Sequence, residues 1–143
     1  MPHALPADVL AMLDVLRRRP DVEAPELVAA DAADRLVLAE ARELLASSGP
    51  GEVAVLDDGY GALALGALAL GAPDVRVATD TVTSERAIRL NAAEVASLGL
   101  ANDPSHVHPV APLDPTSVAS LGLPVDPSRV HPVAPLDPTS VAG

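Results

Sequence analysis

Two adjacent aspartates and two nearby glycines form the stretch of this sequence best suited to binding a ligand. Residues 55–61 read Val-Leu-Asp-Asp-Gly-Tyr-Gly. Glycine lets the backbone turn tightly and come within contact distance of a ligand. A further acid, Asp80, stands at the end of the valine-containing run 75–80. We therefore expect Asp57, Asp58, Gly59, Gly61 and Asp80 to surround one site.

Two classes of ligand compete for this stretch. The segment from Gly59 to Ala64 matches the pattern G-x-G-x-x-G/A, and Asp80 lies at about the right distance to bind a ribose, as in an NAD site. A pyrophosphate, however, needs bare N–H groups at a positive helix end, and Asp57 and Asp58 would repel it. The same carboxylates suit the sulfonium and ammonium of S-adenosylmethionine. We therefore favour a methyl donor, with Asp80 accepting hydrogen bonds from its ribose hydroxyls. A tight strand-to-helix turn without any ligand is the structural alternative.

These residues must be positioned by regular elements, and the sequence alternates helix and strand. Short runs rich in valine predict strands over 52–57, 75–80 and 107–113. Helices are predicted over 8–19, 31–46, from about 62 onward, and 83–98, with Gly99 as a C-cap. Pro109 and Pro112 place the third strand at the border of the sheet. This order is typical of an α/β fold with a parallel open sheet, whose ligands bind at the carboxyl ends of the strands.

The helix patterns also predict which side chains are buried and where the helices end. The helix over 8–19 ends before Pro20, so that its three consecutive arginines at 17–19 lie in its last turn, where cations favour the helix dipole. The side chains expected in the core are Val9, Leu10, Leu13 and Leu16 from this helix, Leu36, Val37, Leu44 and Leu45 from the second, and Ala87, Ile88, Leu90 and Val95 from the last.

Composition excludes several function classes. The 143 residues allow one domain of ordinary size, and a net charge of -11 predicts poor binding to DNA or RNA by this chain alone. Without cysteine there is no disulfide, thiolate metal site or cysteine nucleophile. The longest apolar run, Ala62–Ala72, is about half of the ~20 residues that a membrane span needs. The N-terminus does not resemble a secretory signal, so we expect a cytoplasmic protein without membrane contact.

The remaining candidate residues favour plain structural roles. His106 and His108 would share one side of a strand, but no third ligand is predicted nearby, so we expect no metal. Ser84 and Ser97 lack a histidine or acid at a convincing spacing for a serine hydrolase. Tyr60 is the single aromatic residue, and it could cover an adenine or pack on the first turn of the following helix.

The C-terminal third contains a tandem duplication. Residues 96–118 recur at 119–141 with three differences: Ala101/Pro124, Asn102/Val125 and His106/Arg129. Two copies are too few for a solenoid, so we interpret them as a local duplication. The expected organisation is a helical segment over 1–50, a partial α/β domain over 51–115, and the duplication over 96–141, poorly ordered after about 115.

Residues 52–100 carry a family resemblance. A strand precedes Asp-Asp-Gly-Tyr-Gly-Ala-Leu, and VATDTVTSERAIRLNA and a closing Leu-Gly-Leu follow. This stretch resembles the N-terminal, methyltransferase-like half of the bacterial ribosomal RNA guanine-N2 methyltransferases, and the similarity extends over about 20–115. The resemblance implies an incomplete Rossmann-like sheet of the class I methyltransferase type, with Asp57, Gly59 and Gly61 in the donor-binding motif. Leu63 stands where a third glycine is common.

In that family the catalytic half lies C-terminal and carries an Asn-Pro-Pro-aromatic loop, which this chain lacks. The nearest candidates, Leu113–Thr116 and its copy Leu136–Thr139, read Leu-Asp-Pro-Thr, and we predict turns there. We therefore expect a catalytically incomplete S-adenosylmethionine-dependent methyltransferase half that meets ribosomal RNA through a missing catalytic half. A non-catalytic scaffold and, third, a fragment of an NAD-dependent oxidoreductase are the alternatives.

The fold implied by the resemblance also leaves an edge without a neighbour. In it the first strand is central and is flanked on one side by strands later in the chain. Without them its edge is open, which would permit weak self-association unless the strand of the second repeat covers it.

Overall fold

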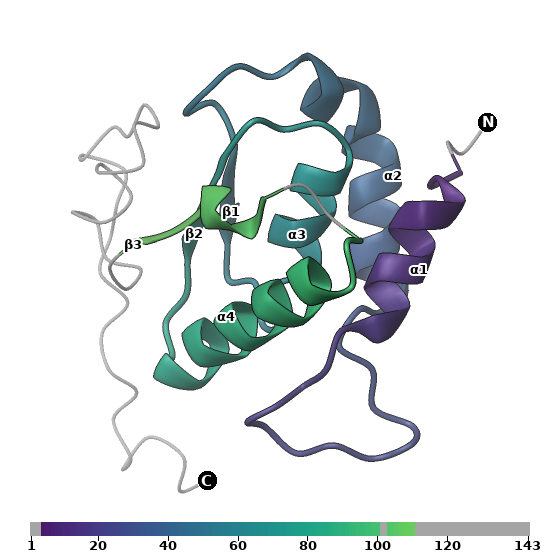
Figure 1. Ribbon diagram of the computed structural model, residues 1–143, viewed down its shortest axis with the longest axis vertical. Helices are drawn as coiled ribbons and strands as arrows, with labels where there is room; N and C mark the ends of the chain where they lie inside the picture. The colour runs from purple at the N-terminus through teal and green to yellow at the C-terminus, as the bar shows by residue number, and fades with distance from the viewer. Residues whose placement is uncertain (1–3, 101–102, 111–143) are drawn as a thin grey trace, which may run out of the picture.

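Three short parallel strands and four α-helices make up the part of the chain described by the computed structural model, residues 4–100 and 103–110 (Figure 1). In chain order the elements are α1 (Ala7–Val15), α2 (Ala32–Ser47), β1 (Ala54–Leu56), α3 (Ala62–Ala69), β2 (Val75–Ala78), α4 (Val82–Ser97), the 3₁₀ helix η1 (Pro104–His106) and β3 (Val107–Val110). The sheet order is β1-β2-β3 with both pairs parallel. The predicted α/β class, an incomplete Rossmann-like sheet with flanking helices, is confirmed.

The register of the strands decides which side chains meet the helices. Val55 lies beside Val77 and Val77 beside Pro109, while Val75 lies beside Val107. Side chains alternate between the two faces of a strand, so these residues share one face. Val75, Val77 and Val107 are buried there with the leucines of α3 and with Ile88 of α4. Figure 1 shows α1, α2 and α3 stacked to one side of the sheet.

Close packing of α2 on α3 depends on a glycine. A Cβ placed on Gly66 would overlap the buried Leu38 side chain of α2, so the missing side chain lets the two helices approach. The core that results is built mostly of alanine, valine and leucine, as the composition predicts.

The first helix ends earlier than predicted. It stops at Val15, and Leu16 has an extended backbone. The Arg17 N–H donates to the Asn91 side chain at 2.9 Å instead of to a carbonyl of its own helix. A tertiary hydrogen bond thus replaces the helical one, and Arg17, Arg18 and Arg19 lie in the following loop. The expectation that they complete the helix end was wrong.

Some side chains predicted to be buried are exposed. On α2 the buried apolar residues are Leu38, Ala39 and Leu45. Three predicted core residues are instead exposed: Leu36 by 59 %, Val37 by 52 % and Leu44 by 75 %. The helix has more apolar residues than its contact with α3 covers. On α4 the predicted residues Ala87, Ile88 and Val95 are buried, but Leu90 is not.

The remaining boundaries agree with the sequence to within a few residues. Pro109 lies in β3, which is an edge strand of this sheet, as proline requires. Gly99 follows the end of α4 and has a φ of +65°. Its N–H donates to the carbonyl of Ala96 in the last turn of the helix. Residues 111–113 of the predicted third strand, the second repeat copy and the expected poor order after about 115 lie outside the described residues. Within the described ranges, no helix is both long and apolar enough to cross a membrane.

Candidate functional site

Two exposed aspartates follow the neighbouring strands β1 and β2. Asp57 comes directly after β1, and its N–H donates to the Ala78 carbonyl at the end of β2 at 2.8 Å. Asp80 lies two residues beyond Ala78, and both carboxylates are exposed. Because the strands run parallel, the structure places Asp57 and Asp80 at the same edge of the sheet.

Asp58 lies differently from its neighbour, because its side chain is enclosed at the start of α3. It is only 3 % exposed. Its Oδ1 accepts the Gly61 N–H at 3.1 Å and its Oδ2 accepts the Ala64 N–H at 2.9 Å. Burial raises the pKa of Asp58, and the two amide hydrogen bonds oppose that rise. The paired carboxylates expected at a ligand are therefore separated: Asp57 faces solvent and Asp58 caps a helix.

The two glycines of the turn also have different roles. Gly61 is the N-cap of α3 and has a φ of +95°, a conformation that side chains strongly disfavour. Gly59 has no positive φ, and a Cβ placed on it would meet no atom within 4 Å. The backbone conformation of the turn thus explains why residue 61 is a glycine. The absence of a side chain on Gly59 leaves open space beside the strand ends.

The single tyrosine connects the glycine turn to the loop after α1. The Tyr60 hydroxyl donates to the Asp21 carboxylate at 2.6 Å and accepts two hydrogen bonds from the Arg18 guanidinium at 2.8 and 3.0 Å. The hydrogen bond from Tyr60 lowers the pKa of Asp21, with smaller contributions that include Arg18, and the same carboxylate raises the pKa of Tyr60. Tyr60 was considered either to cover an adenine or to pack within the fold. Its contacts with Arg18 and Asp21 support the packing role.

Asn91 is a buried polar residue to which the sequence analysis assigned no role. It is 1 % exposed. Its Oδ1 accepts the Arg17 N–H at 2.9 Å, and its Nδ2 donates to the carbonyls of Arg17 at 2.8 Å and of Tyr60 at 2.7 Å. It therefore joins the loop after α1, the glycine turn and α4. The available signal was its position four residues after Ala87 and four before Val95, within the buried stripe of α4.

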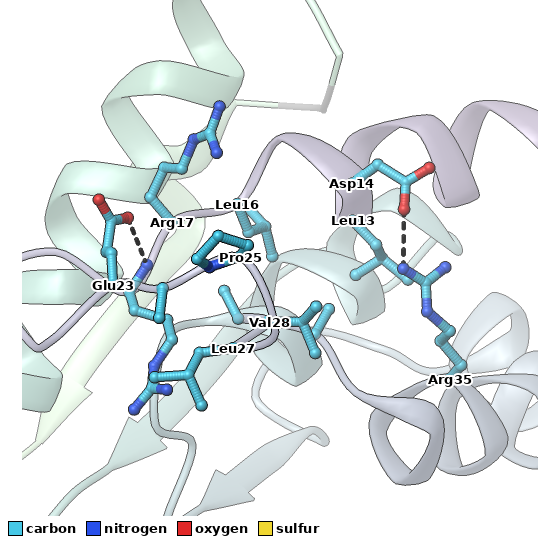
Figure 2. A pocket seen from close by; sticks show the side chains of 13 residues that line it. Leu13, Asp14, Leu16, Arg17, Glu23, Pro25, Leu27, Val28 and Arg35 are labelled. Atoms are coloured by element: carbon cyan, nitrogen blue, oxygen red, sulfur yellow. Dashed lines mark hydrogen bonds and ion pairs between the residues drawn. The ribbon is translucent and has the colours of Figure 1, made fainter.

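A cavity of about 420 Å³ lies between the end of α1, the loop at 16–30 and the start of α2 (Figure 2). Figure 2 shows Leu16, Pro25 and Val28 along it, and Arg35 of α2 reaching Asp14 of α1 at 2.8 Å. None of the four residues predicted to bind the donor, Asp57, Gly59, Gly61 and Asp80, lines this cavity. It is therefore separate from the predicted site.

The two histidines of the first repeat copy lie at and beside the start of β3. The His106 ring contacts the Pro73 carbonyl through Nδ1 at 2.7 Å, and His108 is exposed on β3. The described part of the chain contains no group of three histidine, cysteine, aspartate or glutamate side chains that could hold a metal ion.

Comparison with known proteins gives a family match. The family model of the RLMG N-terminal domain matches residues 11–120, which is more than half of the chain. No curated protein and no solved structure matches the chain.

Proposed function

Because the chain belongs to the RLMG N-terminal domain family, we propose that it is the non-catalytic, methyltransferase-like half of an enzyme that methylates ribosomal RNA at guanine N2. The observation that carries the proposal is the position of Asp58. Its carboxylate holds the first turn of α3 together, so only Asp57 of the adjacent pair is left for a cationic ligand. A turn in which one of the two carboxylates is used for folding supports a scaffold role.

The same contacts oppose an NAD-binding role. A pyrophosphate at a strand-to-helix turn binds to free N–H groups at the helix N-terminus. Here the N–H groups of Gly61 and Ala64 already donate to Asp58. A diphosphate would have to displace a buried carboxylate, and the exposed Asp57 beside it adds further repulsion.

A second candidate function is binding of S-adenosylmethionine without methyl transfer. Asp57 and Asp80 are exposed at adjacent strand ends, and the space beside Gly59 is open. These three residues fit the ammonium, the ribose hydroxyls and the backbone approach of such a ligand, which would supply a sulfonium methyl group. Asp58 does not contribute a carboxylate, because both of its oxygens accept hydrogen bonds from the turn and α3, whereas Gly61 keeps its predicted place in the turn.

Calorimetric titration with S-adenosylhomocysteine and with NAD separates the alternatives. The scaffold function predicts no heat of binding from either ligand at concentrations up to about 1 mM. Micromolar binding of S-adenosylhomocysteine that is lost in Asp80→Ala and retained in Glu94→Ala would establish the donor site instead. Glu94 is a suitable control because it is an exposed acid on α4. Tight NAD binding would overturn the assignment altogether.

A methyl-transfer assay tests the catalytic part of the proposal. With a net charge of -11, the chain alone should not hold a phosphate backbone, so contact with RNA falls to a catalytic half. We expect no transfer of labelled methyl groups from S-adenosylmethionine to naked ribosomal RNA. Sustained transfer by this chain alone would show that it contains a complete active site.

A further inference from the structure

The cavity between the end of α1, the loop at 16–30 and the start of α2 has no part in either function considered above. Its volume of about 420 Å³ lies within the range of roughly 300–1,000 Å³ that is typical of ligand pockets in proteins. The residues predicted to bind the methyl donor do not line it, so a ligand bound here is independent of that site. Its lining combines apolar side chains, charged side chains and backbone groups, which together define the chemistry of a ligand.

Apolar side chains form one part of the cavity lining. Leu16 is buried, whereas Leu27 and Val28 of the loop are 39 % and 59 % exposed. Figure 2 shows these three side chains grouped with Pro25, and labelled charged residues lie to either side of the group. An apolar side chain of a ligand placed there would remove the exposed surface of Leu27 and Val28 from water, which stabilises a complex.

Cations outnumber acids in this cavity, although the chain as a whole has a net charge of -11. Its lining includes three arginines and two acids: Arg17, Arg18, Arg35, Asp14 and Glu23. Asp14 is paired with Arg35 at 2.8 Å. Glu23 accepts the Arg18 backbone N–H at 3.2 Å, and the Arg18 guanidinium is bonded to a tyrosine hydroxyl and to a carboxylate of the same loop. Each of these charged residues except Arg17 therefore has a polar partner for its side chain.

Arg17 is fixed by its backbone and available through its side chain. Its N–H and C=O are both hydrogen-bonded to the buried Asn91 side chain, at 2.9 and 2.8 Å. Its guanidinium makes no hydrogen bond or ion pair with any residue that the structure describes, and the side chain is exposed. A guanidinium presents two parallel N–H groups that match the two oxygens of a carboxylate. The cavity therefore offers a binding position for one carboxylate.

Backbone groups with unused hydrogen-bonding capacity line the cavity as well. Ala29 and Ala30 are only 7 % and 5 % exposed. Within the described ranges, their N–H groups donate to no protein acceptor. Buried N–H groups of folded proteins are nearly always paired. A ligand that contains peptide carbonyls supplies the acceptors, whereas an acid with a plain hydrocarbon chain does not.

We propose that this cavity binds the C-terminal end of a partner polypeptide that finishes on an apolar residue. In this arrangement the terminal carboxylate binds to the Arg17 guanidinium, the last side chain covers Leu27 and Val28, and peptide carbonyls accept the N–H groups of Ala29 and Ala30. A chain end carries a carboxylate, an apolar group and amide carbonyls within two or three residues, so it fits a cavity of this size. A phosphate group would satisfy the arginine but would leave the apolar surface uncovered.

Calorimetric titration of the full chain with the peptide acetyl-Ala-Ala-Leu and with its C-terminal amide tests the carboxylate. We expect the free acid to bind with a Kd below about 1 mM and the amide to bind about tenfold more weakly or worse, because only the acid forms a charge-assisted hydrogen bond. Arg17→Gln should weaken binding of the acid by a similar factor. Arg19→Gln is the matched control, because Arg19 is exposed in the same loop but does not line the cavity, and it should change the Kd by less than about twofold.

Two further measurements test the apolar and backbone contacts. Val28→Asn should weaken binding of the acid about fivefold, whereas Val22→Asn, an exposed valine of the same loop outside the cavity lining, should leave the Kd unchanged. Saturation with the peptide should slow hydrogen exchange of the Ala29 and Ala30 amides about tenfold, while the Gly59 amide at the predicted donor site keeps its rate.

Three outcomes would overturn the proposal. Equal affinity for the acid and the amide would remove the carboxylate from it, and absence of binding by both peptides up to about 1 mM would remove the site. Displacement of the peptide by inorganic phosphate or by a short single-stranded RNA, lost in Arg17→Gln, would replace the chain end by a phosphate ligand. Urea unfolding checks that each variant is folded, and Arg17→Gln keeps both backbone hydrogen bonds to Asn91.

Discussion

Replacing Asn91 should destabilise the whole domain, although the residue is a single polar side chain on α4. It makes three hydrogen bonds of 2.7 to 2.9 Å to the backbone of Arg17 and Tyr60. A hydrogen bond of this kind contributes about 1 kcal/mol net, and a buried partner left unsatisfied costs about 1–3 kcal/mol. Asn91→Ala should therefore lower the free energy of unfolding by about 3 kcal/mol. Against a typical stability of 5–15 kcal/mol, that is a large fraction.

Urea unfolding followed by far-ultraviolet circular dichroism measures this change, and two further variants identify its cause. Asn91→Leu refills the volume without restoring any hydrogen bond, so it should be about as destabilising as Asn91→Ala. Glu94→Ala, exposed on the same helix, should change stability by less than about 0.5 kcal/mol. If Asn91→Leu is as stable as the unaltered protein, the polar contacts do not hold the loop, and the reasoning from hydrogen bonds fails.

Three further predictions concern the turn and the second helix. Because its pKa is raised, Asp58 contributes stability that is present below its ordinary pKa and lost as the pH rises through the raised one. The free energy of unfolding should therefore fall as the pH rises above about 4, and the fall should be smaller in Asp58→Asn, which retains only the part due to the raised pKa of Asp34. Gly61→Ala should cost about 1–2 kcal/mol in urea unfolding because of its positive φ, whereas Gly59→Ala should change little; equal losses would contradict the difference seen in the turn. Asp31→Ala removes the capping box with Asp34 at the start of α2 and should lower the thermal midpoint by an amount equivalent to about 1 kcal/mol, and an unchanged midpoint would show that the cap is dispensable.

Much of the fold could be predicted from local patterns. Each helix and strand of the α/β unit was expected near its observed position, because valine runs and glycine turns are strong local signals. The resemblance to the N-terminal half of ribosomal RNA guanine-N2 methyltransferases is confirmed by the family match. The end of α1 was missed since it depends on a hydrogen bond between Arg17 and Asn91, which lie far apart in the chain.

The site was harder to predict than the fold, because two adjacent residues of one type can have opposite environments. Asp57 and Asp58 are indistinguishable as letters, and only the path of the turn decides which carboxylate is enclosed. Donor binding by Asp57, Gly59, Gly61 and Asp80 stays a prediction. The exposed leucines of α2 were mispredicted for a related reason: periodicity identifies an apolar face but not how much of it a neighbour covers.

The solitary tyrosine gives this protein a built-in optical reporter. With no tryptophan and no phenylalanine, every near-ultraviolet signal of the polypeptide comes from one phenol ring. The hydroxyl of that ring is hydrogen-bonded to a guanidinium and to a carboxylate. Its absorbance, emission and ellipticity therefore follow the attachment of the N-terminal loop to the glycine turn, and docking or release of that loop can be observed in solution without attaching a dye.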